Sequence, residues 1–208
     1  MTITLHENDL PAAVDLGRVV AIDTETMGLN PYRDRLCLVQ LSAGDGHCHI
    51  VRFGQRGGTS ADFAAPHLRR LLTDPAVTKL FHFARFDVAV LYRFLGVWTA
   101  PVYCTKVASR LTRTFTDRHG LKDLCKELLG VDLSKQMQSS DWGAAELSPA
   151  QLDYAAQDVL HLHRIKDIFD ALLAREGRRE LAAACFAFLP TRAHLDLIGW
   201  QEHEIFEH

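Results

Sequence analysis

Short apolar runs rich in β-branched residues, separated by turn-rich stretches, dominate the first half of the chain. Runs of this kind lie at 19–23, 36–42, 48–53, 78–83 and 102–104, and their length is that of buried strands. The first three lie close together along the chain, which favours an antiparallel meander. The later runs alternate with helical patterns, which favours parallel additions to the same sheet.

Helical periodicity takes over in the second half of the chain. Patterns over 61–73, 85–95 and 105–113 predict helices between the later strands, and the sequence after residue 117 has helical character throughout. A final apolar segment over 178–189 is suited to packing against another surface.

The best-marked helix is predicted to begin after Ser148. Ser148 is a favourable N-cap, Pro149 suits the first helical position, and Gln151 completes a capping box. This helix is predicted to run to about residue 175. We therefore predict an α/β domain over residues 1–175, with a mixed central sheet flanked by helices. A C-terminal helical extension over 176–208 would pack on the domain or at a subunit interface.

The composition is that of an ordinary soluble globular protein, with 48% hydrophobic and 24% charged residues. The five cysteines are scattered without a C-x-x-C pair, which predicts reduced thiols in the cytoplasm and argues against a zinc site. Residues 1–9 lack the basic and apolar regions of a secretion signal. No uninterrupted apolar run approaches the ~18 residues that span a bilayer, so we expect no membrane partner. The net charge of −3 favours a short nucleic acid over a long one if the ligand is a nucleic acid.

Two carboxylates end the first apolar run. Asp23 and Glu25 are one residue apart, so on a strand their side chains project from the same face. Like charges at the rim of a hydrophobic sheet repel each other unless a cation lies between them. Oxygen ligands at this spacing suit Mg²⁺ or Mn²⁺. The alternative is a strand that ends in a solvated acidic turn.

Two further acidic sites have ordinary explanations when they are taken singly. Asp87 lies in the first turn of a predicted helix, where an aspartate commonly complements the helix dipole. Tyr154 and Asp158 are four residues apart and share one helix face, as they would on any amphipathic helix.

Taken in order, these five residues resemble the DEDD superfamily of 3′–5′ exonucleases, in the subclass that carries a tyrosine. Asp23-x-Glu25 ends a strand, Asp87 begins a helix, and Tyr154-x-x-x-Asp158 lies on a late helix. The sister subclass has a histidine five residues before the last aspartate, and this chain has Asp153 there. Tyr154 therefore assigns the subclass.

The surrounding sequence resembles the ribonuclease D group over about residues 15–170. The sequence Ser-Ser-Asp-Trp at 139–142 is followed by a similar stretch at 147–159. The sequence Gly-Leu-Lys-Asp-Leu at 120–124 is followed by Leu-Leu-Gly-Val at 128–131. The implied fold is the ribonuclease H-like 3′–5′ exonuclease fold.

Two departures from the family pattern are visible. Phe83 stands where many members carry asparagine, and the sequence at 144–146 replaces a frequent Arg-Pro pair. The chain also ends before the helical RNA-binding domains of full-length ribonuclease D. With Asp-Thr-Glu-Thr-Met-Gly-Leu-Asn-Pro at 23–31, it is most similar to the nanoRNase C group, which degrades very short RNAs and assembles into rings.

The resemblance implies roles for the residues that match the motifs. Asp23, Glu25, Asp87 and Asp158 would bind two divalent ions, either Mg²⁺ or Mn²⁺, with Asp23 the bridging ligand. Tyr154 would orient the attacking water, since a phenol with a pKa near 10 is a poor base at neutral pH.

Substrate contacts are expected from the segments that surround these residues. Leu29 is either a wedge between the last two bases or a core leucine after a turn. The full set of expected substrate-binding residues is Thr24, Thr26, Met27, Gly28, Leu29, His82, Arg85, Phe86, Gln138, Ser139 and Ser140. Four further basic residues are candidates for phosphate contacts: Lys106, Arg110, Arg113 and Lys135.

The function expected from these features is two-metal hydrolysis of short single-stranded RNA, down to dinucleotides, to 5′-mononucleotides. We expect a homo-oligomer, with an octameric ring as one form. Three alternatives stay open at this point. They are ribonuclease D-like trimming of structured RNA such as tRNA 3′ ends, DNA proofreading, and an inactive nuclease fold that serves as a binding scaffold. A scaffold should have lost a metal ligand, and none of the four is missing.

Overall fold

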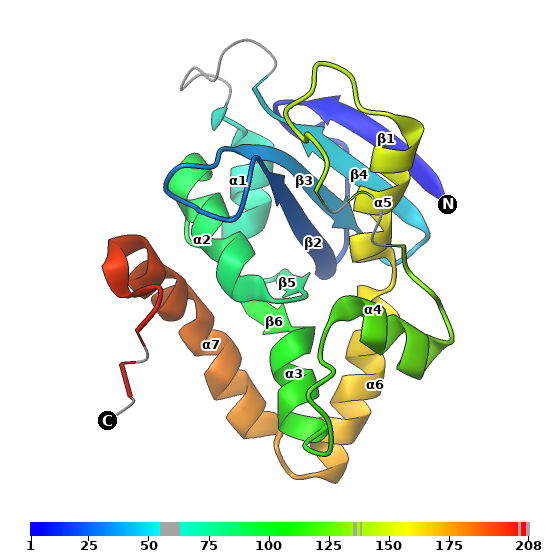
Figure 1. The fold of residues 1–208 in the computed structure, drawn as a ribbon, viewed down its shortest axis with the longest axis vertical. Helices are drawn as coiled ribbons and strands as arrows, with labels where there is room; N and C mark the ends of the chain where they lie inside the picture. The colour runs from blue at the N-terminus through cyan, green and yellow to red at the C-terminus, as the bar shows by residue number, and fades with distance from the viewer. Residues whose placement is uncertain (55–62, 135–136, 138, 204, 207–208) are drawn as a thin grey trace.

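A six-stranded mixed sheet forms the centre of the protein in the computed structural model (Figure 1). The structure describes residues 1–54, 63–134, 137, 139–203 and 205–206. The strand order is β1-β4-β3-β2-β5-β6. The strands are β1 (Thr2–Glu7), β2 (Val19–Thr26), β3 (Leu36–Ser42), β4 (His47–Arg52), β5 (Thr78–Phe81) and β6 (Val102–Cys104).

The pairing of the strands follows the pattern of the apolar runs. β2 pairs antiparallel with β3, and β3 pairs antiparallel with β4, so these three strands form the predicted meander. β5 and β6 are added in parallel beyond β2. The predicted α/β class with a mixed central sheet is therefore confirmed.

The edge strand β1 was not predicted from the sequence. It pairs in parallel with β4, and most of its residues are exposed or half-buried. The signal used to predict buried strands is an apolar run, and Thr2–Glu7 contains too many polar residues to give one. This strand is held by its backbone pairing with β4.

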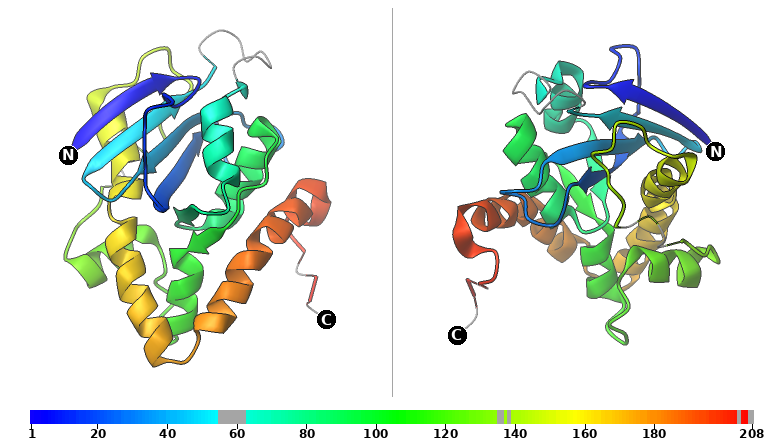
Figure 2. Two further views of the ribbon diagram at one scale, coloured as in Figure 1. Left: turned by 180° about the vertical axis from the view of Figure 1, so that it is seen from behind. Right: turned by 45° about the horizontal axis from the view of Figure 1, so that its top comes forward.

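Helices cover both faces of the sheet and extend below it (Figures 1 and 2). α5 packs on β2, β3 and β4, whereas α1 lies on the opposite face. Below the sheet in Figure 1, α3 packs between α6 and α7. The helices are α1 (Pro66–Thr73), α2 (Ala84–Leu95), α3 (Thr105–Thr112), α4 (Leu121–Leu124), α5 (Pro149–Leu160), α6 (Leu162–Arg175) and α7 (Arg179–Leu195).

The single helix predicted from Pro149 to about residue 175 is wrong in the structure, because it is broken at His161. His161 has φ −101° and ψ −10° and separates α5 from α6. The two halves bury their apolar faces against different partners, α5 against the sheet and α6 against α3. A straight helix would be unable to satisfy both surfaces. The capping box that begins α5 is present as predicted.

Two other predicted helical stretches need correction. The described residues between 130 and 147 form turns and extended chain instead of a helix, since they are rich in turn-forming glycine, serine and aspartate. The helix predicted over 61–73 begins at Pro66, whose ring suits a first helical position. The region before it includes residues 55–62, which lie outside the described residues.

The C-terminal segment packs on the rest of the molecule. α7 contacts α2, α3, α6 and β6, and it continues into a wider π-helical turn, η3 (Asp196–Trp200). By length and composition alone, the stretch Arg179–Trp200 could also cross a membrane. This is weak evidence, because core helices of soluble proteins meet the same criteria. All five cysteines are free thiols.

The start of α5 provides a test of the capping box. In Ser148→Ala, the backbone N–H of Gln151 loses its side-chain acceptor. We expect the free energy of unfolding to fall by about 1 kcal/mol and the melting temperature to fall by roughly 2–4 °C. Circular dichroism during heating measures this. Thr114→Ala, at an exposed position after α3, is the control and should change less. Equal shifts would show that the capping box does not set the stability of this helix.

Candidate active site

The site begins where β2 ends. Asp23 and Glu25 lie on one face of this strand, and the alternating Thr24 and Thr26 lie on the other, where both are buried. A register shift between Glu25 and Thr26 marks a bulge in the pairing with β3. Bulges of this kind bend a strand and redirect its side chains, so the strand leaves the sheet just after the two carboxylates.

A third carboxylate reaches this face from α5. Asp158 offers an oxygen that lies within 4.8 Å of carboxylate oxygens of both Asp23 and Glu25. α5 packs against β2, and this packing brings residues more than a hundred positions apart into one cluster. Three converging oxygen ligands fit a hard divalent cation such as Mg²⁺. This arrangement favours the interpretation of Asp23 and Glu25 as metal ligands over that of a strand ending in a solvated acidic turn.

Burial and mutual repulsion make the charged form of these carboxylates unfavourable unless a cation is bound. Burial, together with the charges of Asp87, Asp158 and Glu25, raises the pKa of Asp23 well above its usual range. Burial and the charges of Asp158 and Asp87 raise the pKa of Glu25 to about 9. Burial, and then Asp87, raises the pKa of Asp158 to about 7. In the absence of a cation the cluster therefore retains protons up to neutral pH, and a bound divalent ion would displace them.

Asp87 lies beside this cluster in the first turn of α2 and is buried. Its Oδ1 accepts a hydrogen bond of 2.7 Å from the Thr24 hydroxyl. Burial raises the pKa of Asp87 to about 7, and the Thr24 hydroxyl lowers it in part. The structure groups the other three acidic residues as one ligand set and places Asp87 close enough to repel Asp23 and Glu25. Its role as a fourth ligand stays a prediction.

Tyr154 lies one helical turn before Asp158 on α5. Burial raises the pKa of its phenol, and so do the charges of Asp158, Glu25 and Asp23. The phenol therefore stays protonated and is a hydrogen-bond donor. Its ring lies 5.9 Å from the buried ring of Trp142. Trp142 thus supports Tyr154 from the Ser-Ser-Asp-Trp motif, a contact that the sequence motif did not specify.

Cavities extend from the carboxylates in two directions. One of about 270 Å³ is lined by Asp23, Tyr154, Asp158, His82 and Lys122, among others. The His82 ring makes a 2.9 Å hydrogen bond with the Thr105 hydroxyl. Burial, and then the charge of Lys106, lowers the pKa of His82 to about 3, so His82 is neutral. Lys122 was not singled out from the sequence, because surface lysines give no distinguishing signal.

The second cavity, of about 350 Å³, gathers most of the expected substrate-binding residues. Leu29 lines it and is 83% exposed, which excludes the core alternative for this leucine. Its role as a wedge stays a prediction. The lining residues are Thr24, Glu25, Thr26, Met27, Gly28, Leu29, Phe86, Ser139, Ser140 and Trp142. Gln138 and Lys135 lie outside the described residues.

Two of the predicted basic contacts have protein partners. Arg85 makes a two-pronged ion pair with Asp196, with both N–O distances 2.6 Å. Arg113 is buried and forms an ion pair with Glu127, so its predicted phosphate contact is wrong. Lys106 Nζ lies 4.0 Å from the centre of the Phe83 ring. The pairing of Arg85 with Asp196 was not predicted, since the two residues are 111 positions apart.

Comparison with known proteins places this geometry in context. A family profile described as 3′–5′ exonuclease matches residues 6–174. Ribonuclease D of Gluconacetobacter diazotrophicus is 37% identical over 170 residues, which cover 82% of this chain and 42% of that protein. Ribonuclease D of Granulibacter bethesdensis is also 37% identical, over 76% of this chain and 38% of that protein. The chain thus spans less than half of these relatives.

Solved structures match over the whole chain. Brucella melitensis NrnC is 56% identical, covers 100% of both chains and superposes with a TM-score of 0.93. The same protein with bound Mg²⁺ gives 55% identity, full coverage of both chains and a TM-score of 0.92. Its complex with pGG gives 56% identity and a TM-score of 0.94, and covers 100% of this chain and 99% of that chain.

The carboxylate cluster predicts a linked dependence on pH and metal. The pKa values of Asp87 and Asp158 rise to about 7 and that of Glu25 to about 9 on folding. The metal-free folded protein therefore binds more protons than the unfolded chain. Its stability should fall as pH rises from about 4, the usual carboxyl pKa, to about 7 for Asp87 and Asp158 and to about 9 for Glu25, by about 1.4 kcal/mol per pH unit for each extra proton held. Mg²⁺ should raise the melting temperature more at pH 8–9 than at pH 6.

Differential scanning fluorimetry with and without Mg²⁺ checks this across the pH range. Asp158→Asn removes one ligand charge and should weaken both the Mg²⁺ effect and its growth with pH. A Mg²⁺ shift that is the same at every pH would contradict the linkage.

Proposed function

Because this chain belongs to the 3′–5′ exonuclease family, in its ribonuclease D-like branch, we propose that it hydrolyses short single-stranded RNA, down to dinucleotides. The products would be 5′-mononucleotides. Family membership confirms the sequence-based prediction of a ribonuclease D-like 3′–5′ exonuclease. The substrate class rests on one main observation: the likeness to NrnC, including its complex with pGG, extends over the full chain.

Two divalent ions, Mg²⁺ or Mn²⁺, would be held by Asp23, Glu25 and Asp158, with Asp87 beside them. The oxygen donor set and the raised pKa values of these carboxyls fit such ions, and NrnC has been solved with Mg²⁺. When bound, the ions lower the pKa of a water nucleophile and stabilise charge on the leaving 3′-oxygen.

The protein's own groups would position the reactants around the scissile phosphate. Tyr154 stays protonated and would donate a hydrogen bond to the oxygen of the attacking water. Leu29, exposed at the rim, would pack between the two bases that flank the scissile bond. His82 is neutral and faces the cavity shared with Asp23 and Asp158, so it adds no charge that would compete with the metal.

We include a homo-oligomer, with an octameric ring as one form, in the proposal. Exposed apolar side chains gather in the C-terminal part of the chain, which favours association. They are Leu181, Phe188, Ile198, Trp200, Ile205 and Phe206. Native mass spectrometry tests this, and a monomer at micromolar concentration would contradict it. A reducing cytoplasm, where free thiols persist, is the proposed location.

Substrate length is the most direct test of the proposed function. We expect 5′-labelled RNAs of two to seven nucleotides to be cleaved with Mg²⁺, with the dinucleotide preferred over a structured RNA with a matched 3′ end. Denaturing gel electrophoresis of timed samples measures this preference. Asp158→Asn is the inactive control. Equal or faster cleavage of the structured RNA would instead support ribonuclease D-like trimming.

Tyr154→Phe tests the proposed role of the phenol. It removes one hydroxyl and keeps the ring that packs near Trp142. We expect kcat on a dinucleotide to fall by about 10²–10⁴-fold, as for a lost proton-handling or water-orienting group. The Mg²⁺-induced change in melting temperature should stay as in the wild type. Full activity in this variant would remove Tyr154 from the mechanism.

A further inference from the structure

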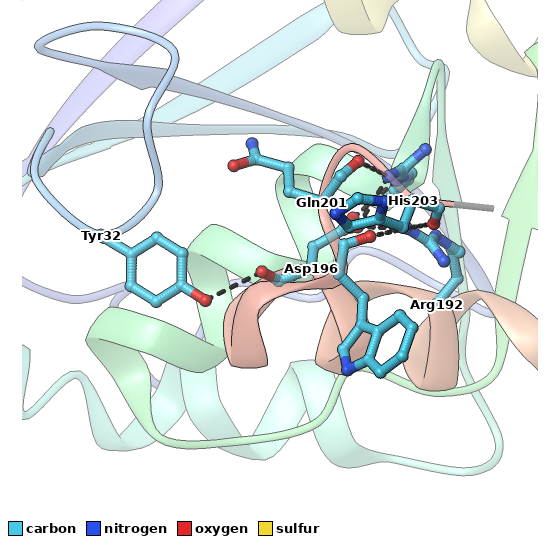
Figure 3. A network of polar contacts seen from close by, with 7 residues as sticks. Tyr32, Arg192, Asp196, Gln201 and His203 are labelled. Carbon is cyan, nitrogen blue, oxygen red and sulfur yellow. Dashed lines mark hydrogen bonds and ion pairs between the residues drawn. The ribbon is translucent and has the colours of Figure 1, made fainter. Parts of the chain in front are cut away.

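Asp196, at the junction of α7 and η3, is the centre of a polar network that the catalytic residues do not explain. Its carboxylate is buried, with the residue 4% exposed. Oδ2 accepts from Arg85 Nε at 2.6 Å, and Oδ1 accepts from Arg85 Nη2 at 2.6 Å and Arg192 Nη2 at 2.8 Å. The Tyr32 hydroxyl donates to the Asp196 carbonyl oxygen at 2.9 Å. Figure 3 shows Tyr32 and Arg192 reaching Asp196 from opposite sides.

Besides Arg192 of α7, Asp196 binds one residue from each of the two segments that carry Leu29 and Phe86, which line the cavity beside Glu25. Arg85 is next to Phe86 and two residues before Asp87, in the first turn of α2. Tyr32 is three residues after Leu29, in the loop that follows β2. Through one buried carboxylate and its own carbonyl, Asp196 therefore ties the Leu29 loop to the start of the helix that carries Asp87.

A cavity of about 380 Å³ lies between these tied segments. Leu29 and Phe86 line it, and both also line the cavity that contains Glu25. Its far wall comes from the C-terminal turn, through Asp196 and Gln201. The Gln201 carbonyl accepts from Arg85 Nη2 at 2.8 Å, so the same ion pair holds this wall in place. The contact between the C-terminal turn and α2 therefore helps to shape this cavity next to Leu29.

Tyr32 and Arg85 lie within the residues that the exonuclease family profile matches, whereas Asp196 and Arg192 lie beyond its end at residue 174. General exonuclease chemistry therefore does not require the network as a whole. Burying the Asp196 carboxylate costs free energy. This cost is tolerated where paired cations and hydrogen bonds satisfy the carboxylate. Arg85 and Arg192 supply that compensation. A buried ion pair of this kind is a weak source of net stability, and its geometric precision is better suited to fixing one arrangement of the segments.

We propose that Asp196 is a positioning residue that sets substrate binding beyond the scissile phosphate, by fixing the Leu29 loop and the Arg85–Phe86 turn against the C-terminal segment. This inference rests on the proposed function for its kinetic readout. In this proposal Arg85 is held by its ion pair with Asp196. Arg85 therefore affects substrate binding indirectly, by fixing the position of its segment. The part of the substrate whose binding depends on Asp196 is the nucleoside that leaves when the terminal nucleotide is released.

Two substrates separate this role from chemistry at the metal site. The dinucleotide contains the leaving nucleoside, whereas the p-nitrophenyl ester of uridine 5′-phosphate replaces that nucleoside with p-nitrophenolate. For Asp196→Asn, we expect kcat/KM on the dinucleotide to fall at least about tenfold more than kcat/KM on the ester, chiefly through KM. Equal losses on the two substrates would overturn the positioning role.

Asp170→Asn is the control for loss of a paired carboxylate at a more exposed position, since the Asp170 side chain is 43% exposed and that of Asp196 is 6% exposed. Asp170 also forms an ion pair with a cation four residues away, Lys166, and also contacts a tyrosine hydroxyl, that of Tyr103. It lies on α6, away from the Leu29 loop. We expect its ratio of dinucleotide to ester activity to match the wild type. A selective dinucleotide defect in Asp170→Asn would mean that general destabilisation produces the effect attributed to Asp196.

A readout that does not depend on activity keeps the proposal testable if the substrate assignment fails. Hydrogen exchange of backbone amides in residues 84–87 should be about tenfold faster in Asp196→Asn than in Asp170→Asn, because the ion pair with Arg85 is lost while the Asp196 carbonyl that accepts from Tyr32 remains. Tyr32→Phe removes a single hydrogen bond and should accelerate exchange in the Leu29 loop alone. Unchanged exchange in both variants would refute the positioning role, whereas inactivity of the wild type on RNA would refute the proposed function.

Discussion

Repulsion among buried carboxylates at the end of β2 is the constraint on which this site depends. Asp23, Glu25 and Asp158 bring oxygens within 4.8 Å of one another, in a place where burial already opposes their charge. Such a cluster is stable as a set of anions when a multivalent cation is shared among them. The sheet and α5 supply the packing that holds these groups together against their mutual repulsion. The carboxylate oxygens of these residues are ligands suited to a hard divalent cation.

Around this cluster, the neighbouring groups are arranged to keep their charge states fixed. Thr24 donates to Asp87 from the buried face of β2, so the strand that presents two ligands also orients a third acidic residue. Burial, and then the charges of Asp158, Glu25 and Asp23, raise the pKa of Tyr154 and keep its phenol protonated. His82 is held neutral by burial and by Lys106. His82 therefore adds no positive charge to the cavity that it shares with Asp23 and Asp158.

Sequence reasoning succeeded where a local pattern has a single physical meaning. The apolar run ending in Asp23 and Glu25 predicted a strand with two carboxylates on one face, and the capping box predicted the start of α5. It failed where the answer depends on distant partners. The break at His161 follows from the different surfaces that α5 and α6 cover, and β1 is held by pairing with β4 despite its polar sequence. The ion pair between Arg85 and Asp196 joins residues 111 positions apart, and no local sequence pattern predicts it.

If the carboxylates of β2 and α5 exchange protons for a divalent cation, calorimetry detects that exchange directly. Titration of the wild-type protein with Mg²⁺ at pH 7.5, repeated in buffers of different ionisation enthalpy, measures the protons released per ion bound. We expect clear proton release on binding, because the pKa of Asp158 is raised to about 7 and that of Glu25 to about 9 in the metal-free protein. We also expect Asp158→Asn to lose most of the Mg²⁺ binding. Binding of Mg²⁺ without proton release, or with unchanged affinity in Asp158→Asn, would contradict this exchange.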